Sequence, residues 1–175
     1  MAGLGDEGYA LSDADLAKLV PGIKVLRYPE LANMESVDEA LDKHGRAMLL
    51  FLTEDENTGH WVCMMKKGKT IEYFDPYGGY GPDAERDWLT EEQAEALGQD
   101  EPILSRLIKR SGYKVKINPY KFQKEGGNMN TCGRHCATRL MLGHLPLKEY
   151  AQMISNSGVP PDDFVTTFTS QLLRK

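Results

Sequence analysis

The 175-residue chain has only three cysteines, and an odd number argues against a framework of disulfide bonds. It also lacks a secretory signal, since residues 1–16 are acidic and rich in small residues, with no basic and then apolar segment. No apolar run approaches the ~20 residues of a membrane-spanning helix. We therefore expect an intracellular protein of the virion or of the host cytoplasm or nucleus, neither secreted nor bound to a membrane.

A basic surface of the kind that binds nucleic acid is also lacking, because the net charge is -5. Segment 109–124 departs from this balance and gathers Lys109, Arg110, Lys114, Lys116, Lys121 and Lys124. The simplest interpretation is a solvated strand with its flanks. An activating nucleic acid or peptide that binds this segment is the alternative.

No internal repeat or low-complexity tract divides the sequence, and we expect a monomer with one domain spanning 1–175. Three short apolar runs in the middle predict strands at 47–52, 60–65 and 70–74, the last two joined by a turn at 66–69. Helical and extended patterns flank them. Helices are expected at 13–19, 36–45, 102–110, 132–142, 147–154 and 162–173, and extended segments at 23–26 and 113–117. Strands between two groups of helices predict an α+β fold.

Cys132 is the cysteine whose surroundings fit a nucleophile. It stands at the start of a predicted helix, where free amide groups and the positive end of the helix dipole favour a thiolate. Gly133 follows it and leaves the sulfur uncrowded. The alternative is a small buried hydrophobic residue, which is the interpretation that we give to Cys136, one turn later, and to Cys63 on a strand.

His60 is the histidine best placed to act as the base that a nucleophilic thiol needs. It opens a predicted strand directly after Gly59, at the mouth of a polar loop. Two other histidines follow or end helices, where a positive ring favours the C-terminal dipole. His135 lies inside the Cys132 helix and is too constrained to meet the thiol.

Asp75 is the expected partner of His60, because it follows the second strand of the predicted hairpin. With the turn centred between residues 67 and 68, antiparallel pairing places Asp75 opposite His60. A turn residue before Pro76 is the alternative for Asp75 taken alone. The paired register favours a Cys132–His60–Asp75 site.

A zinc site is an alternative interpretation, since histidines and cysteines recur near these positions. Residues 60 and 63 point to opposite faces of a strand and cannot chelate one ion. The spacing of Cys132 and Cys136 also differs from the Cys-x2-Cys turn of structural zinc sites. We therefore expect no metal and no organic cofactor.

Three motifs in order resemble the adenain/Ulp1-like cysteine proteases (clan CE), which include maturation proteases of adenovirus, virophages and large DNA viruses. They are Gly59-His60-Trp61, Phe74-Asp75-Pro76-Tyr77-Gly78 and the segment from Asn130 to Cys136. The resemblance covers roughly 45–145. It implies a papain-like fold with a central mixed or antiparallel sheet flanked by helices, and the nucleophile at a helix N-terminus.

The resemblance also implies the roles of individual residues. Cys132 matches the nucleophile, His60 the general base and Asp75 the orienting acid. Trp61 matches an aromatic residue that narrows the substrate channel, which implies cleavage after small residues such as Gly. Gln123 matches the glutamine that donates to the oxyanion, although it lies farther upstream of the cysteine than usual, so that Asn128 and Asn130 are alternatives.

These features predict a cysteine endopeptidase that cleaves virion structural precursors during maturation. A protease that removes ubiquitin-like modifiers from proteins is one alternative, and a non-catalytic binding module on the same fold is another. The intact set of cysteine, histidine and aspartate favours an enzyme.

Overall fold

The computed structural model describes residues 3, 5–55, 58–126 and 130–175. Its centre is one mixed five-stranded sheet with the strand order β1-β2-β3-β4-β5. The two outer pairs are parallel and the two inner pairs are antiparallel. The strands are β1 (Lys24–Arg27), β2 (Arg46–Leu52), β3 (Gly59–Lys67), β4 (Thr70–Phe74) and β5 (Lys114–Ile117).

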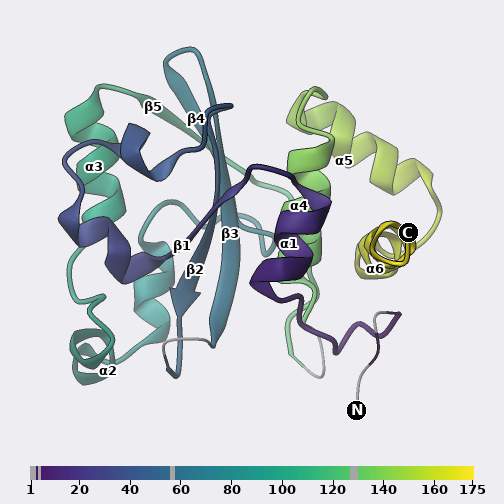
Figure 1. Ribbon diagram of the computed structural model, residues 1–175, viewed down its shortest axis with the longest axis horizontal. Helices are drawn as coiled ribbons and strands as arrows, with labels where there is room; N and C mark the ends of the chain where they lie inside the picture. The colour runs from purple at the N-terminus through teal and green to yellow at the C-terminus, as the bar shows by residue number, and fades with distance from the viewer. Residues whose placement is uncertain (1–2, 4, 56–57, 127–129) are drawn as a thin grey trace.

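Helices cover both faces of the sheet, as Figure 1 shows, which confirms the predicted α+β class and the mixed sheet. The α-helices are α1 (Asp13–Leu19), α2 (Glu91–Ala96), α3 (Ile103–Ser111), α4 (Cys132–Met141), α5 (Leu147–Asn156) and α6 (Pro161–Leu173). Short 3-10 helices are η1 (Tyr28–Asn33), η2 (Val37–Ala40) and η3 (Ala84–Trp88). Within the described ranges, none of the helices combines the length and the apolarity that crossing a membrane requires.

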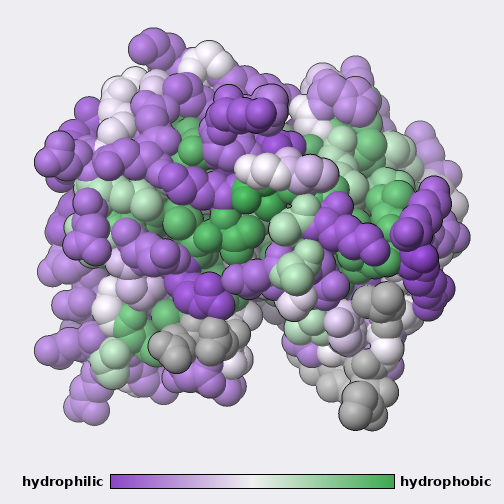
Figure 2. Space-filling model, viewed as in Figure 1, coloured by the Kyte–Doolittle hydropathy of each residue, from purple (hydrophilic) through white to green (hydrophobic). Residues whose placement is uncertain are grey.

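Successive side chains of β3 point to opposite faces of the sheet and pack into two separate parts of the core. Trp61, Cys63 and Met65 face the layer of α1, α4, α5 and α6, whereas Val62 and Met64 face the layer of α3. Both faces of this central strand are therefore buried, as its unbroken apolar run predicted. On the face that Figure 2 shows, hydrophilic residues predominate at the edges and hydrophobic residues form a band across the middle that extends to the right.

One predicted helix is wrong. Ser36 caps a helical turn as expected, but the turn is the 3-10 helix η2, which ends at Ala40 instead of continuing to Gly45. The reason lies in Asp42, whose carboxylate accepts hydrogen bonds from the backbone N–H groups of His44 and Arg46 at 2.8 and 3.0 Å. Such local side-chain bonds stabilise a turn in place of a helix.

A buried ion pair joins the sheet to α4. Arg139 donates from Nε and Nη2 to the two carboxylate oxygens of Glu72 on β4, at 2.8 and 2.9 Å. The Arg139 side chain is fully buried and also donates to the carbonyl oxygens of Leu142 and Leu145. These bonds fix α4 on the sheet and thereby place its first residue, Cys132.

Candidate active site

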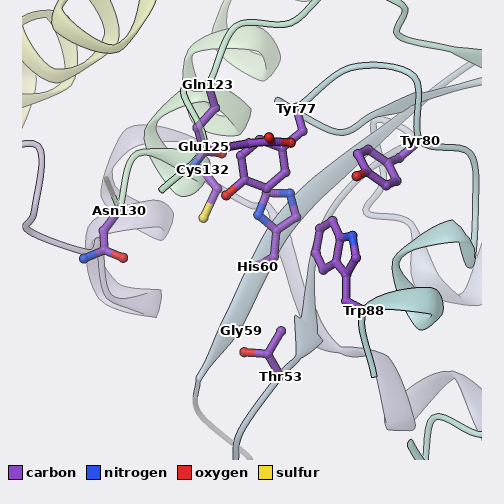
Figure 3. A pocket seen from close by; sticks show the side chains of 10 residues that line it. All are labelled: Thr53, Gly59, His60, Tyr77, Tyr80, Trp88, Gln123, Glu125, Asn130 and Cys132. Carbon is purple, nitrogen blue, oxygen red and sulfur yellow. The ribbon is translucent and has the colours of Figure 1, made fainter. Parts of the chain in front are cut away.

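Cys132 begins α4, as predicted, and its sulfur lies in a cleft at the end of the sheet (Figure 3). The backbone N–H of Trp61 points at Sγ from 3.4 Å, which joins Cys132 to β3. Gly133 permits this approach, because a Cβ there would lie 3.2 Å from Cδ1 of Trp61. The helix start supplies the free amides and the partial positive charge that favour a thiolate.

His60 and Asp75 form a buried pair, with His60 Nε2 2.8 Å from Asp75 Oδ1. The same oxygen accepts a hydrogen bond from the backbone N–H of Tyr77 at 2.9 Å. Cys132 lies next to His60 on the wall of the same cleft, close enough for each group to shift the pKa of the other. The structure therefore brings the three predicted residues together, with His60 next to both Asp75 and Cys132.

The predicted register that led to Asp75 is wrong by two residues. β3 and β4 pair Cys63 with Phe74 and Lys67 with Thr70, so the hairpin is centred between residues 68 and 69. Continued to His60, this register reaches Tyr77, whose ring stacks on the His60 ring at 4.7 Å between centroids and 6° between planes. A shift of two residues preserves the face on which a side chain lies, so His60 and Asp75 still meet.

The electrostatics of His60 and Cys132 favour an ion pair. Burial alone lowers the pKa of His60, but its bonds to Asp75 and Cys132 outweigh burial and raise that pKa to about 10. Burial raises the pKa of the Cys132 thiol, but the hydrogen bond and charge of His60 bring it below its ordinary value. Between these two pKa values the site holds a thiolate and an imidazolium.

Gln123 lines the same cleft as Cys132 and His60. Its backbone N–H and that of Phe122 both donate to the carbonyl oxygen of Pro76, at 3.0 and 2.9 Å, so the loop is fixed directly beside Asp75. Gly78 makes this packing possible, because a Cβ there would collide with the Tyr120 carbonyl. The Gln123 side chain is buried in the wall of this cleft.

Of the two alternatives to Gln123, Asn128 and Asn130, the structure describes only the second. Asn128 lies outside the described residues. Asn130 is described, and its Nδ2 donates to the Gly8 carbonyl at 2.8 Å while its backbone N–H donates to the Glu7 carbonyl. The Asn130 amide therefore holds the N-terminal segment, which favours Gln123 as the donor in the cleft.

Asp162 is a residue of the site that the sequence did not reveal. Its Oδ1 accepts from Oγ1 of Thr131 at 2.6 Å and lies 2.8 Å from Nε2 of His135. Its Oδ2 accepts from the backbone N–H of Lys124 at 3.0 Å. One carboxylate on α6 thus ties the start of α4 to the loop that carries Gln123. The only signal in the sequence was an acidic residue after Pro161, which predicts a helix start and no more.

Two hollows meet at the Cys132 sulfur. The first, of about 360 Å³, is lined by His60, Gln123, Glu125 and the aromatic residues Tyr77, Tyr80 and Trp88. The second, of about 340 Å³, is lined by Trp61, Gly133, Arg27 and the segment 10–13. Gly59, Asn130 and Cys132 border both hollows. Trp61, predicted as a substrate-binding residue, is 7% exposed and belongs to the wall of the second hollow.

The remaining cysteines are buried in the core, as predicted. Cys63 and Cys136 have no exposed surface, and burial holds the pKa of the Cys136 thiol well above its ordinary value. His60 and Cys63 lie on opposite faces of β3, which is the geometry that argued against shared zinc ligation.

The pH at which iodoacetamide alkylates Cys132 should therefore depend on His60. We expect Cys132 to react at a lower pH than an ordinary cysteine, because its pKa is lowered and the thiolate forms as the pH rises through that pKa. In His60→Ala the positive charge that stabilises the thiolate is lost while Cys132 remains buried, so the onset of alkylation should move to higher pH. Mass spectrometry of each cysteine peptide across a pH series measures both.

His144→Ala is the matched control for that experiment, since His144 is exposed and lies at the far end of α4. Its pH profile should coincide with that of the unmodified chain. Preferential labelling of Cys63 or Cys136, or an unchanged onset in His60→Ala, would contradict the assignment of the pair.

Comparison with known proteins finds a relative in a virophage. The chain is 36% identical over 169 residues to the "Uncharacterized protein V9" of the Sputnik virophage, which covers 93% of this chain and 95% of the relative. No protein-family model matches the chain. Among solved structures, the central domain of the uncharacterized Lpg1148 protein from Legionella pneumophila covers 95% of this chain and 99% of its own length. That pair shares 18% identity with a TM-score of 0.46.

Proposed function

This chain belongs to the same family as the uncharacterized protein V9 of the Sputnik virophage, which supports a viral origin, and from its site we propose that it is a cysteine endopeptidase. The observation that carries the proposal is the grouping of the bonded pair Asp75–His60 with Cys132, which stands at a helix N-terminus in the same cleft as His60. We also propose a papain-like, Ulp1-type fold and virion structural precursors as substrates. The sequence motifs support the fold, and the viral origin of the relative supports a viral substrate.

The proposed reaction is acyl transfer to the thiol. The Cys132 thiolate attacks the scissile carbonyl carbon and forms a carbon–sulfur bond, while the carbonyl oxygen becomes an oxyanion. The carbon–nitrogen bond then breaks as the His60 imidazolium gives its proton to the leaving amine. Water, deprotonated by His60, attacks the thioester and releases the acid and the thiolate. Asp75 orients the ring and stabilises its positive form throughout.

Gln123 and the backbone N–H of Cys132 are the proposed donors to the oxyanion. The N–H belongs to the first residue of α4 and has no partner within the helix at that position. The bonds to the Pro76 carbonyl hold Gln123 in place before substrate binds, so little reorganisation accompanies the reaction. Loss of one donor of this kind typically costs about 100- to 1000-fold in rate.

A preference for small residues before the cleaved bond is part of the proposal, and the position of Trp61 on the wall of the second hollow supports it. Trp61 and the segment 10–13 close around the side of Cys132 that carries the acyl group. A fluorogenic peptide amide ending in Gly-Gly should be hydrolysed at least about tenfold faster than one ending in Gly-Leu, measured as kcat/KM. Pretreatment with iodoacetamide should stop both reactions.

The same assay separates the other candidate functions. Processing of a co-expressed virion structural protein supports the proposed substrate class. Rapid cleavage of a ubiquitin-like precursor without processing of that structural protein would instead identify a modifier-removing protease. If no amide bond is cut while Cys132 remains alkylatable, the chain acts as a binding module and the protease proposal fails.

A further inference from the structure

One of the two hollows beside Cys132 receives the leaving group, and the position of His60 identifies which one. The leaving amine must receive its proton from His60, which lines only the first hollow. The acyl group, bonded to the sulfur, then extends into the second hollow beside Trp61 and Gly133. This assignment rests on the proposed function. The part of the substrate that follows the cleaved bond therefore lies among Tyr77, Tyr80, Trp88 and Glu125.

Aromatic faces form most of the wall on the leaving side. Trp88 lies 5.2 Å from Tyr80 and 5.9 Å from Tyr77 between ring centroids, in edge-to-face arrangements at 75° and 77°. Figure 3 shows Tyr80 and Trp88 side by side, across from the Cys132 sulfur. Trp88 is 36% exposed, so part of its ring is open to a ligand. Rings set at such angles offer π surface from more than one direction, which favours a cation.

The charges around this wall are predominantly negative. Asp75 and the Cys132 thiolate contribute two negative charges and the His60 imidazolium contributes one positive charge. Glu125 adds a carboxylate on the wall of the same hollow. Its surface partner is Lys121, with 3.6 Å between Nζ and Oε2 and both side chains more than half exposed. A pair that exposed is weak and screened by salt, so Glu125 remains available to a ligand.

We propose that the leaving side of the cleft is a subsite for a cationic side chain. Its ligand is a lysine or arginine at the first or second position after the cleaved bond, held over the faces of Tyr80 and Trp88 with Glu125 as its counter-ion. A neutral aliphatic chain of the same length would keep the apolar contact but lose the attraction to the π faces and the carboxylate. An acidic side chain would meet repulsion from Glu125.

Binding of short peptides tests this subsite without any cleavage. Ala-Lys-Ala amide, its norleucine analogue and its glutamate analogue represent the leaving part of a substrate and differ in one side chain. Titration into the Cys132→Ala protein, followed by the tryptophan fluorescence to which Trp88 contributes, gives each Kd. The lysine peptide should bind about five- to tenfold more tightly than the norleucine peptide, and the glutamate peptide most weakly.

Two variants locate the effect. Glu125→Gln and Tyr80→Leu should each reduce the ratio of lysine to norleucine affinity by about threefold, and 0.5 M salt should reduce it mainly where Glu125 is intact. Glu149→Gln on α5 is the matched control, an exposed glutamate that lines neither hollow, and it should leave the ratio unchanged.

Equal affinity for the lysine and norleucine peptides would overturn the subsite and leave the protease proposal intact. A lysine preference that survives both Glu125→Gln and Tyr80→Leu would also overturn it. If the preference holds as expected but no peptide amide is ever cut, the subsite stands and the protease proposal fails. The two ideas therefore fail by different results.

Discussion

Replacement of Cys132 by alanine is expected to lower kcat/KM for peptide cleavage by about a thousandfold or more. The substitution removes the atom that forms the acyl bond, and no other described thiol can take its place. Cys63 and Cys136 are fully buried, and their sulfurs point at the backbone carbonyl oxygens of Cys136 and Trp61. Hydrolysis of a Gly-Gly fluorogenic amide by equal amounts of folded protein measures the effect.

Cys136→Ala is the matched control, because it deletes the same atom one helical turn later. It leaves a small core cavity and is expected to cost on the order of 1 kcal/mol of stability, with activity per folded molecule retained. Comparable activity in Cys132→Ala and the unmodified chain would end the proposal of thiol chemistry at this site.

Arg139→Met is expected to destabilise the fold by about 3–5 kcal/mol. The methionine fills part of the space but leaves the Glu72 carboxylate with no opposite charge, although both of its oxygens accept from Arg139 in the intact protein. Taking a charge out of water is costly unless a partner compensates it. The midpoint and slope of urea unfolding, followed by circular dichroism, measure the loss.

The double variant Glu72→Met with Arg139→Met separates the two contributions. Replacing both members of a buried pair by apolar groups is often close to neutral, so the double variant should recover most of the lost stability. A double variant as unstable as Arg139→Met alone would show that Arg139 acts through its bonds to the Leu142 and Leu145 carbonyls instead.

Local patterns in the sequence were enough to predict the core of the fold and most of the proposed site. Apolar runs and turn residues located the middle strands, and alternation placed His60 and Cys63 on opposite faces. The hairpin register was two residues off because the turn lies over Gly68 and Lys69, where Gly68 adopts a positive φ of 62°. The pairing of Asp75 with His60 was still predicted correctly, because the error in the register is an even number of residues. A shift of one residue would have placed Asp75 on the opposite face.

The parts that sequence reasoning missed depend on contacts between distant segments. Asp162 reaches Thr131, His135 and the backbone of Lys124 only because α6 packs on α4. Trp88 lies in η3, within a polar stretch whose helical signal is weak, and it meets His60 only through the folded chain. The helix predicted at 36–45 is wrong for a local reason, because the hydrogen bonds of the Asp42 side chain stabilise a turn instead. Neither kind of contact has a periodic signature in the sequence.

The position of Asp162 along the chain also sets an order of events during synthesis. The ribosome makes Asp75, His60, Gln123 and Cys132 before it makes α6, so a nascent chain holds every proposed reacting group while the carboxylate that joins α4 to the Gln123 loop is still missing. Domains fold once their distant contacts can close. The cleft therefore acquires its final geometry only after α6 has been made, and a chain that stops before α6 lacks the anchor for the Gln123 loop beside its thiol.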